Sequence, residues 1–435
     1  MPQAVTDGET GVVAGLAAWL DTLERRNRES IVLGLERVLA VRARLGLNPE
    51  FAIITVGGTN GKGSACAYLE AVFIAAGYRV GCYTSPHLLR YNERVRVAGT
   101  EVRDADLCAA FAAVEAARRD IPLTYFEQGT LAAMWLFQRA GLDVAILEVG
   151  LGGRLDAVNA WDADCALVTS VDLDHQHFLG DTRDAIGFEK SGIFRSGKPA
   201  ICGDTNPPAS LLEQADRTGA MLFRLGMDIQ VEFAESTWTC RVGGQAFPAL
   251  PRLAMTGRHQ YGNAACAVAA LWCLREGLPV PMGALRAGLA DARQPGRFQI
   301  VGHRPMQILD VAHNPHAAQA LADNLADMPP GGRIVAVFAM LADKDVEGVV
   351  APLMHHVRHW HVAGLEGPRG LTGPELLRRL TALGCEASLH TSVEAAWHAA
   401  CRGLEPADTI ITFGSFHTVA GVMAEMNGGI PDKHG

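Results

Sequence analysis

The sequence predicts an α/β protein with two parallel sheets that carry helices on both faces, and a small antiparallel patch between them. Short apolar strands alternate with alanine-rich helices over residues 51–171, and the same alternation restarts over residues 305–416. A third segment, residues 221–250, has the period-two pattern of antiparallel strands. Strands that are joined through helices by short loops form right-handed crossovers, which place the strands parallel in one sheet.

The first half of the chain contains the longer alternating region. Apolar residues at helical spacing, beginning with Leu16 and Trp19, predict helix over residues 12–45. The expected strands are short and largely apolar, as strands buried on both faces of a sheet are. These strands are 51–58, 79–85, 143–150 and 165–171, and the helices expected between them are 64–77 and 129–141.

The later part of the chain predicts the patch, a hinge and a second domain. Ile229, Val231 and Phe233 alternate in one run, and Trp238, Cys240 and Val242 alternate in a second, which predicts the small antiparallel patch. After a helix at 263–276, Pro and Gly at 288–301 indicate a hinge. The restarted alternation predicts a smaller, Rossmann-like α/β domain, so we expect domains at 1–295 and 296–435. Its predicted elements are strands 305–312, 333–340, 358–364 and 409–416 and helix 316–326.

Composition excludes several classes of protein. The chain of 435 residues is 49% apolar and 20% charged, which is typical of a globular protein, and its formal net charge of −9 argues against nucleic-acid binding. Ten cysteines without a CxxC pair indicate a reduced, cytoplasmic protein. The first residues lack the basic and apolar regions of a signal peptide, and no apolar run is long enough to span a membrane.

A glycine-rich loop between the first sheet strand and its helix predicts a phosphate-binding P-loop. Glycines let backbone amides approach phosphate oxygens, the helix N-terminus carries about half a positive charge, and Lys62 adds a full charge. Gly63 separates this lysine from the hydroxyl of Ser64, which departs from the commonest pattern. The alternative is a plain turn. The predicted ATP-binding residues of the loop are Gly58, Thr59, Asn60, Gly61, Lys62, Gly63 and Ser64.

Three polar residues stand at predicted strand ends, where a parallel sheet opens its ligand crevice. Ser85 and Glu148 offer the oxygen ligands that Mg²⁺ prefers, and His175 is a less usual ligand. Taken alone, Ser85 also fits a helix cap, and the run around His175 contains too few nitrogen and sulfur ligands for zinc. Lys190, taken alone, fits an exposed surface charge.

A series of short segments occurs in one highly specific order along nearly the whole chain. The segments are LGLERV, GGTNGKGS, TSPHLLRYNERVRV, FEQGTLAAMWLF, EVGLGGRLDAVNA, SVDLDHQHFLG, FEKSGIFRSGKPAI, PGRFQIV, DVAHNPHA and GSFHTVA. In these segments the chain resembles the folylpolyglutamate synthase family, which is related to the Mur ligases of cell-wall synthesis. The resemblance implies an ATP-dependent ligase that adds L-glutamate to dihydropteroate and to reduced folates. It also implies that residues 1–295 bind ATP and the pterin and that residues 296–435 form a glutamate-ligase domain.

The resemblance implies roles for residues that the spacing alone leaves open. Lys62, His175 and a carbamylated Lys190 are expected to take part in catalysis, with Ser85, Glu148 and His175 binding magnesium. Two magnesium ions are expected, with ATP as co-substrate, and a monovalent cation such as K⁺ is compatible with the resemblance. Further ATP-binding residues implied by the resemblance are Asn263, Arg297, Asp310 and His313.

The resemblance also implies where the other substrates bind. The RLDA segment favours an enzyme that accepts dihydropteroate, and Lys344 and Ser415 are weaker candidates for contacting L-glutamate. We expect a monomer that needs no nucleic acid, membrane or protein partner. The residues implied for the pterin are Thr124, Tyr125, Phe126, Glu127, Leu155, Asp156 and Ala157.

Two other functions compete with this interpretation. A Mur ligase that acts on a UDP-sugar peptide would carry an additional N-terminal α/β domain, for which about 57 mostly helical residues before the loop leave no room. A nucleotide-dependent switch would bind ATP without ligation, but it needs no such set of polar residues at strand ends. The expected ligase reaction proceeds through an acyl phosphate, and closure of the second domain would keep water from that intermediate.

Overall fold

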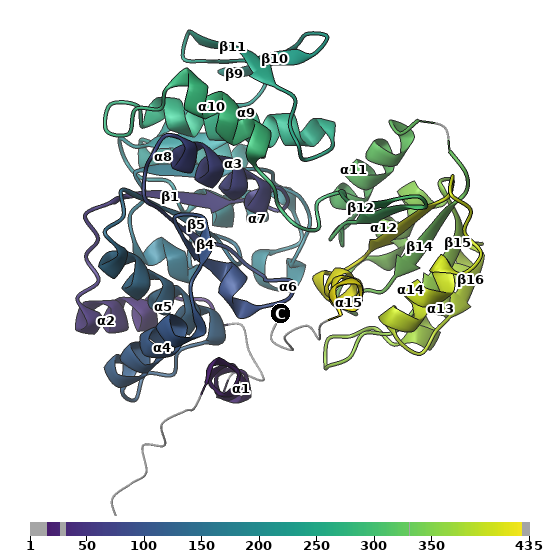
Figure 1. Ribbon diagram of the computed structural model, residues 1–435. Coiled ribbons are helices and arrows are strands. Elements are labelled where there is room, and N and C mark those ends of the chain that lie inside the picture. The colour runs from purple at the N-terminus through teal and green to yellow at the C-terminus, as the bar shows by residue number, and fades with distance from the viewer. Residues whose placement is uncertain (1–14, 27–31, 330, 429–435) are drawn as a thin grey trace, which may run out of the picture.

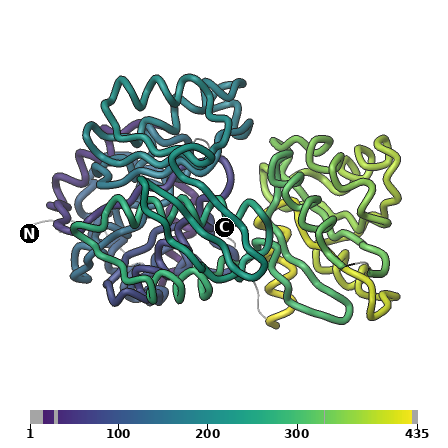
Figure 2. The backbone as a smooth tube through the Cα atoms, turned by 90° about the horizontal axis from the view of Figure 1, so that it is seen from above, coloured from purple at the N-terminus to yellow at the C-terminus, as the bar shows by residue number. Residues whose placement is uncertain are grey.

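The computed structural model describes residues 15–26, 32–329 and 331–428, which form two lobes side by side (Figure 1). The first lobe, up to residue 291, holds an eight-stranded sheet and a separate three-stranded sheet, and the second lobe, from residue 299, holds a six-stranded sheet. Figure 2 shows the second lobe in green and yellow beside the first. The predicted α/β class with a small antiparallel patch is confirmed.

The large sheet has the strand order β4-β3-β2-β5-β1-β6-β7-β8. Neighbouring strands are parallel from β2 to β8, whereas β3 and β4 are antiparallel additions at one edge. The central strands β5 and β6 are buried throughout, which explains their largely apolar sequences. The strands are Ala52–Gly57 (β1), Val80–Tyr83 (β2), Val95–Val97 (β3), Thr100–Glu101 (β4), Val144–Glu148 (β5), Cys165–Val168 (β6), Pro199–Cys202 (β7) and Met221–Arg224 (β8).

Helices cover both faces of this sheet, and each face has its own apolar core. On one face α3 packs so closely against α10 that a Cβ on Gly288 would lie 2.4 Å from the Cα of Val72. On the other face α4 and α5 pack together. The helices are Lys62–Ala75 (α3), Asp104–Arg118 (α4), Tyr125–Ala140 (α5), Gln176–Leu179 (α6), Arg183–Ser191 (α7), Ala209–Thr218 (α8), Arg258–Cys273 (α9) and Met282–Asp291 (α10).

The N-terminal helical region is divided in two. The structure has α1 at Leu16–Arg26 and α2 at Glu36–Leu45, and Gly34, with φ of 150°, precedes the second helix. A conformation of this kind suits glycine and is not helical, so the expectation of one continuous helix over residues 12–45 was wrong. Residues 12–14 and 27–31 of that expectation, and the N-terminal residues judged for a signal peptide, lie outside the described residues.

The antiparallel patch is smaller than its predicted range. Its strands are Ile229–Phe233 (β9), Thr237–Val242 (β10) and Gln245–Pro251 (β11). Residues 221–224 instead form β8, which pairs parallel with β7 at the edge of the large sheet, so placing them in the patch was wrong. The reason is the preceding α8, which ends at Gly219 with positive φ and returns the chain to the sheet as a crossover.

The second lobe is a six-stranded sheet of order β12-β13-β17-β14-β15-β16, in which only β12 is antiparallel to its neighbour. Phe338, Trp360 and Phe413 form its aromatic core, with the ring centroids of the latter two 5.3 Å and 4.8 Å from that of Phe338. The strands are Gln299–His303 (β12), Met306–Leu309 (β13), Ile334–Phe338 (β14), Val357–Val362 (β15), Ala387–Leu389 (β16) and Thr409–Phe413 (β17), and the helices are Pro315–Ala326 (α11), Val346–Val350 (α12), Gly373–Ala382 (α13), Val393–Cys401 (α14) and Phe416–Asn427 (α15).

The segment between α10 and β12 joins the two lobes. It is shorter than the hinge predicted over residues 288–301, because α10 continues to Asp291 and β12 begins at Gln299. The predicted domain boundary between residues 295 and 296 falls inside this segment. Across the described parts of the chain, no helix combines the length and apolarity needed to cross a membrane.

Candidate active site

A cavity of about 820 Å³ lies between the two lobes. On the first lobe it is lined from the carboxyl ends of the neighbouring strands β2, β5, β1 and β6, and on the second lobe from those of β13, β17 and β14. Carboxyl ends of parallel strands are where α/β sheets bind ligands. The predicted site residues that line the cavity are Gly58, Thr59, Asn60, Gly61, Lys62, Gly63, Ser64, Ser85, Glu148, His175, Lys190, Asn263, Arg297, Asp310, His313, Lys344 and Ser415.

The loop between β1 and α3 requires two of its glycines. Gly58 has φ of 140°, and a Cβ there would lie 1.9 Å from the Oγ1 of Thr169. Gly61 has φ of 87°, and a Cβ there would lie 2.6 Å from the Oδ1 of Asn263. Any other residue would therefore force the loop away from β6 and α9, so the glycines fix its path.

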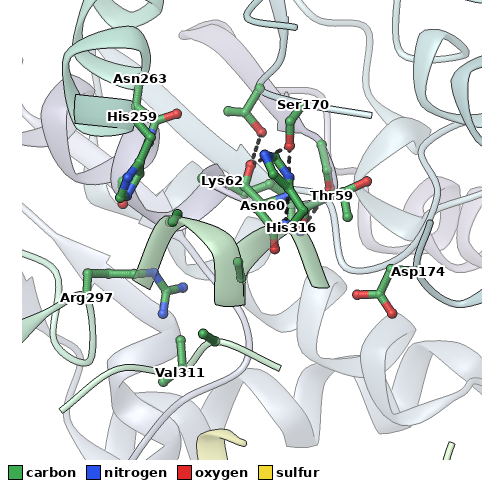
Figure 3. A pocket seen from close by; sticks show the side chains of 18 of the residues that line it. Thr59, Asn60, Lys62, Ser170, Asp174, His259, Asn263, Arg297, Val311 and His316 are labelled. Atoms are coloured by element: carbon green, nitrogen blue, oxygen red, sulfur yellow. Dashed lines mark hydrogen bonds between the residues drawn. The ribbon is translucent and has the colours of Figure 1, made fainter. Parts of the chain in front are cut away.

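The end of β6 holds the loop in place. The backbone amide of Thr59 donates to the carbonyl of Ser170 at 2.8 Å, and the amide of Asn60 donates to the Ser170 Oγ at 3.0 Å (Figure 3). The Thr169 hydroxyl donates to the carbonyl of Asn60. Sequence reasoning missed Thr169 and Ser170. Their position after a strand that neighbours β1 is the signal that would have indicated them.

Two side chains of the loop have polar groups that suit a phosphate ligand. The Lys62 Nζ donates to the carbonyls of Gly58 and Thr59 at 3.0 Å and 3.2 Å, so its charge lies over the loop. The Ser64 Oγ is buried and has no hydrogen-bond partner among the described residues. A buried hydroxyl left unpaired costs roughly 1–3 kcal/mol, and a phosphate oxygen or a hydrated ion would supply its partner.

The predicted metal ligands follow three strands of the large sheet, β2, β5 and β6. Glu148 ends β5, is buried, and accepts a hydrogen bond at 3.0 Å from the backbone amide of Ser85, which follows β2. Burial raises the pKa of Glu148, and the positive charge of Lys62 opposes that rise. A buried carboxylate beside a serine hydroxyl fits a hard divalent cation such as Mg²⁺.

His175 stands on the loop after β6 in a left-handed conformation, with φ of 53°. Burial lowers its pKa to about 4, and the charge of Lys344 acts in the same direction against the attraction of Asp174. The imidazole is therefore neutral at physiological pH and offers a lone pair to a metal. Among the described residues no group of three or more His, Cys, Asp and Glu side chains is placed for a metal.

Lys190 is buried near the end of α7, which contradicts the alternative of an exposed surface charge. Burial lowers the pKa of its amine to about 7, and the charge of Lys62 acts in the same direction. About half of such amines are neutral at pH 7, and a neutral amine is the form that reacts with CO₂ to give a carbamate.

Asp174 connects the two lobes inside the cavity and was not predicted as a site residue. Its carboxylate forms an ion pair with Lys344 of the second lobe, and its side chain is only 10% exposed. It also accepts a hydrogen bond at 3.2 Å from the Asn314 Nδ2 and lies 3.5 Å from the His313 Nε2. Burial would raise the pKa of Asp174, but His313, His175 and Lys344 together hold it well below its usual value.

Other residues from the hinge and the second lobe complete the wall. Arg297 points toward the nucleotide loop (Figure 3), and its guanidinium lies 5.4 Å from the ring centroid of Phe416. Asp310 follows β13 and accepts hydrogen bonds at 2.8 Å from the backbone amides of Phe298 and Ala312, while burial raises its pKa. Ser415 caps the N-terminus of α15. Arg297 lies in the segment that joins the lobes, whereas Asp310 and Ser415 belong to the second lobe.

The residues predicted for the pterin do not line this cavity. Thr124, Tyr125, Phe126 and Glu127 begin α5, and Leu155, Asp156 and Ala157 lie beside that helix, behind residues 150–152, which do line it. Phe126 fills the position where a Cβ on Gly150 would stand, and Asp156 accepts a hydrogen bond at 2.8 Å from the Leu151 amide. Burial raises the pKa of Asp156 to about 7, so this carboxyl can also donate a hydrogen bond.

Comparison with known proteins identifies the same two parts of the chain. Residues 56–271 match the Mur ligase middle domain, and residues 296–416 match the Mur ligase glutamate ligase domain. A dihydrofolate synthase/folylpolyglutamate synthase of Escherichia coli K12 is 50% identical over 409 residues, which is 94% of each chain.

Solved structures agree with these matches over nearly the whole chain. E. coli FolC in complex with DHPP and ADP is 48% identical with a TM-score of 0.92, and the match covers 97% of this chain and 99% of that one. A bifunctional folylpolyglutamate synthase/dihydrofolate synthase with Mn, AMPPNP and L-glutamate bound is 47% identical with a TM-score of 0.89, over 96% and 99% of the two chains.

Proposed function

Because the chain belongs to the Mur ligase family, among its dihydrofolate synthases/folylpolyglutamate synthases, we propose that its interlobe cavity carries out the ligation of that group. The chain is an ATP-dependent ligase that joins L-glutamate to dihydropteroate and to reduced folates. The observation that supports the location is the convergence of the nucleotide loop, Glu148 and Lys190 with Lys344 of the second lobe on one cavity. An ATP, a carboxylate acceptor and an amino acid need such a shared site.

We assign the ATP phosphates to the loop of residues 58–64. The loop amides at the start of α3 and the ammonium of Lys62 face the cavity, and both favour anions. Magnesium, when bound, neutralises phosphate charge and polarises the transferring phosphoryl group. Ser85, Glu148 and His175 are the residues that would hold it, with carbamylated Lys190 beside a second ion, and Asn263, Arg297, Asp310 and His313 would surround the remaining nucleotide.

The first chemical step forms an acyl phosphate. An oxygen of the acceptor carboxylate attacks the γ-phosphorus of ATP, and the bond to the β–γ bridging oxygen breaks, so ADP leaves with the electron pair. Lys62 lies close enough to the loop carbonyls of Gly58 and Thr59 to exchange these contacts for the outer phosphate oxygens. Its charge then stabilises the negative charge that shifts during transfer.

The second step forms the amide. The neutral amine of L-glutamate attacks the acyl carbon, the amine loses a proton, and phosphate departs with the oxygen that came from the carboxylate. Water would hydrolyse the acyl phosphate, so the contact of the second lobe with the nucleotide loop has a chemical purpose. We assign the L-glutamate to the second-lobe side, where Lys344 and Ser415 line the cavity.

The pterin end of the acceptor is proposed to bind beside α5 and the segment of Asp156. Glu127 and Asp156 are both buried there, and a pterin ring offers donors and acceptors that two such carboxyls can match. The Gly150–Gly152 backbone separates this region from the cavity, so the acceptor would pass this segment with its carboxylate toward Glu148.

Two competing functions are distinguished from the proposed one by different observations. A nucleotide switch has no need of a lysine buried in the cavity that the nucleotide loop lines, whereas the proposed carbamate requires one. A ligase for UDP-sugar peptides would be distinguished by its acceptor. The monomeric state, the number of magnesium ions and the use of K⁺ stay predictions. A cytoplasmic location is also a proposal, supported by the ten cysteines, all of which are free.

An assay of phosphate release tests the proposed function. With ATP and magnesium, we expect phosphate release that depends on L-glutamate with dihydropteroate and also with tetrahydrofolate, and the product of each pair should gain one glutamate by mass spectrometry. Omitting glutamate or the acceptor provides the control. Release with a UDP-sugar peptide and with neither pterin substrate would overturn the assignment.

A further inference from the structure

Among the residues that the structure describes, the polar contacts between the two lobes differ in burial. Arg258 and Asp327 form an ion pair at 3.8 Å, with side chains 89% and 67% exposed. His316 and Asp172 lie 3.7 Å apart and are partly exposed. In the pair of Asp174 and Lys344, by contrast, the side chains are 10% and 7% exposed.

The buried pair belongs to a network that reaches the nucleotide loop. The side-chain amides of Asn60 and Asn314 are paired: the Nδ2 of each donates to the Oδ1 of the other at 3.0 Å. The Asn314 Nδ2 also donates to the carboxylate of Asp174. Asn60 also bonds to His316 at 3.1 Å (Figure 3). A shift of the second lobe would therefore break contacts to both the loop and Asp174.

The position of Asp174 explains how one carboxylate can hold several side chains of the second lobe. Its own Oδ1 accepts from the backbone amide of His175 at 2.8 Å, which fixes the side chain on the first lobe. Its remaining acceptor capacity faces Lys344, His313 and Asn314, which come from two separate loops of the second lobe. A fixed carboxylate that accepts from several donors sets their mutual positions.

We propose that Asp174 is a positioning residue that aligns the second lobe on the first, by holding Lys344, His313 and Asn314 over the nucleotide loop. The inference rests on the proposed ligase activity in one respect, because the aligned lysine is the one assigned to the L-glutamate side. Asp174 itself has no assigned contact with a substrate. Its effect on the reaction is exerted through the side chains that it holds.

A double-variant cycle tests this alignment. We expect Asp174→Asn and Lys344→Met each to lower kcat/KM for L-glutamate by about 100-fold, because each leaves a buried charge without its partner. The kcat/KM of the double variant should be no lower than that of the less active single variant, since the two residues act as one unit. Asp327→Asn, which breaks the exposed interlobe pair, should stay within about twofold of the parent.

Two further measurements distinguish alignment of the lobes from an effect on the metal site or on local packing. If saturating magnesium restores the rate of Asp174→Asn, then Asp174 acts through the metal site and the proposal is wrong; we expect no such recovery. Small-angle X-ray scattering with a nonhydrolysable ATP analogue should give a larger radius of gyration for Asp174→Asn than for Asp327→Asn. The alignment would be overturned if the two variants had equal radii of gyration and if the loss in the double variant equalled the product of the losses in Asp174→Asn and Lys344→Met.

The scattering comparison also keeps this inference distinct from the proposed function. It measures the arrangement of the lobes and does not depend on turnover. An inactive parent protein would contradict the ligase assignment, whereas an active parent whose Asp174→Asn variant keeps its rate and its radius would contradict the alignment alone.

Discussion

Lys62→Ala should lower the rate of phosphate release with both dihydropteroate and tetrahydrofolate by a factor of about 10³ or more. The reason is the repulsion between the two anions that must react. Unit charges about 4 Å apart at an effective dielectric near 20 repel by roughly 4 kcal/mol, and Lys62 is the cation on the nucleotide loop that offsets this repulsion. Steady-state kinetics with both acceptors, alongside a thermal unfolding scan, gives the measurement.

The matched control for this variant is Lys198→Ala. Lys198 is half exposed and pairs with Asp164 away from the cavity, so its loss should leave turnover within about twofold. Lys62→Arg should recover little activity, because a planar guanidinium does not replace a compact ammonium above a tight loop. A folded Lys62→Ala protein that retains a normal rate would show that the loop does not hold the reacting phosphates.

Lys190→Ala should lower turnover by at least about 100-fold while the protein stays folded, because the variant cannot form the proposed carbamate. In the parent protein the amine has a pKa of about 7, lowered by burial. Below that pH the amine is protonated and does not react with CO₂, so the rate should fall as the pH drops. Between pH 8 and pH 6 at constant dissolved CO₂, the neutral fraction falls about tenfold.

The CO₂ dependence distinguishes this prediction from a simple packing role. Removing CO₂ from the buffers should reduce the parent rate, bicarbonate should restore it, and native mass spectrometry should show one added CO₂ that Lys190→Ala lacks. Lys198→Ala should keep the same CO₂ response as the parent. A rate that ignores CO₂, with no added mass, would leave Lys190 as an unmodified residue and rule out the carbamate.

Most of the fold could be predicted because its strands are locally encoded. The central strands β1, β5 and β6 are apolar along most of their length, and β1 and β5 are each followed by a glycine-rich loop. The edge strand β8 was assigned to the wrong sheet, since its four residues are only partly buried and lie directly before the alternating residues of the patch. Only the crossover through α8 decides between them.

The nucleotide side of the site could be predicted for the same local reason. Ser85, Glu148 and the loop at Lys62 follow parallel strands that turn out to be neighbours, so the topology brings together what the sequence separates. Their ligand roles stay predictions. Asp174 could not be recognised, because its importance depends on how the second lobe docks and on Lys344, which is 170 residues away. The separation of Asp156 from the cavity likewise depends on packing around Gly150.

A crystal structure with a nonhydrolysable ATP analogue, magnesium and dihydropteroate tests the central claim most directly. We predict the triphosphate along residues 59–64, the Lys62 Nζ bonded to an outer phosphate oxygen instead of to the Gly58 carbonyl, and an ion beside Glu148 with the acceptor carboxylate facing the γ-phosphorus. A triphosphate bound elsewhere, with Lys62 still on its own loop and no ion at Glu148, would contradict this account.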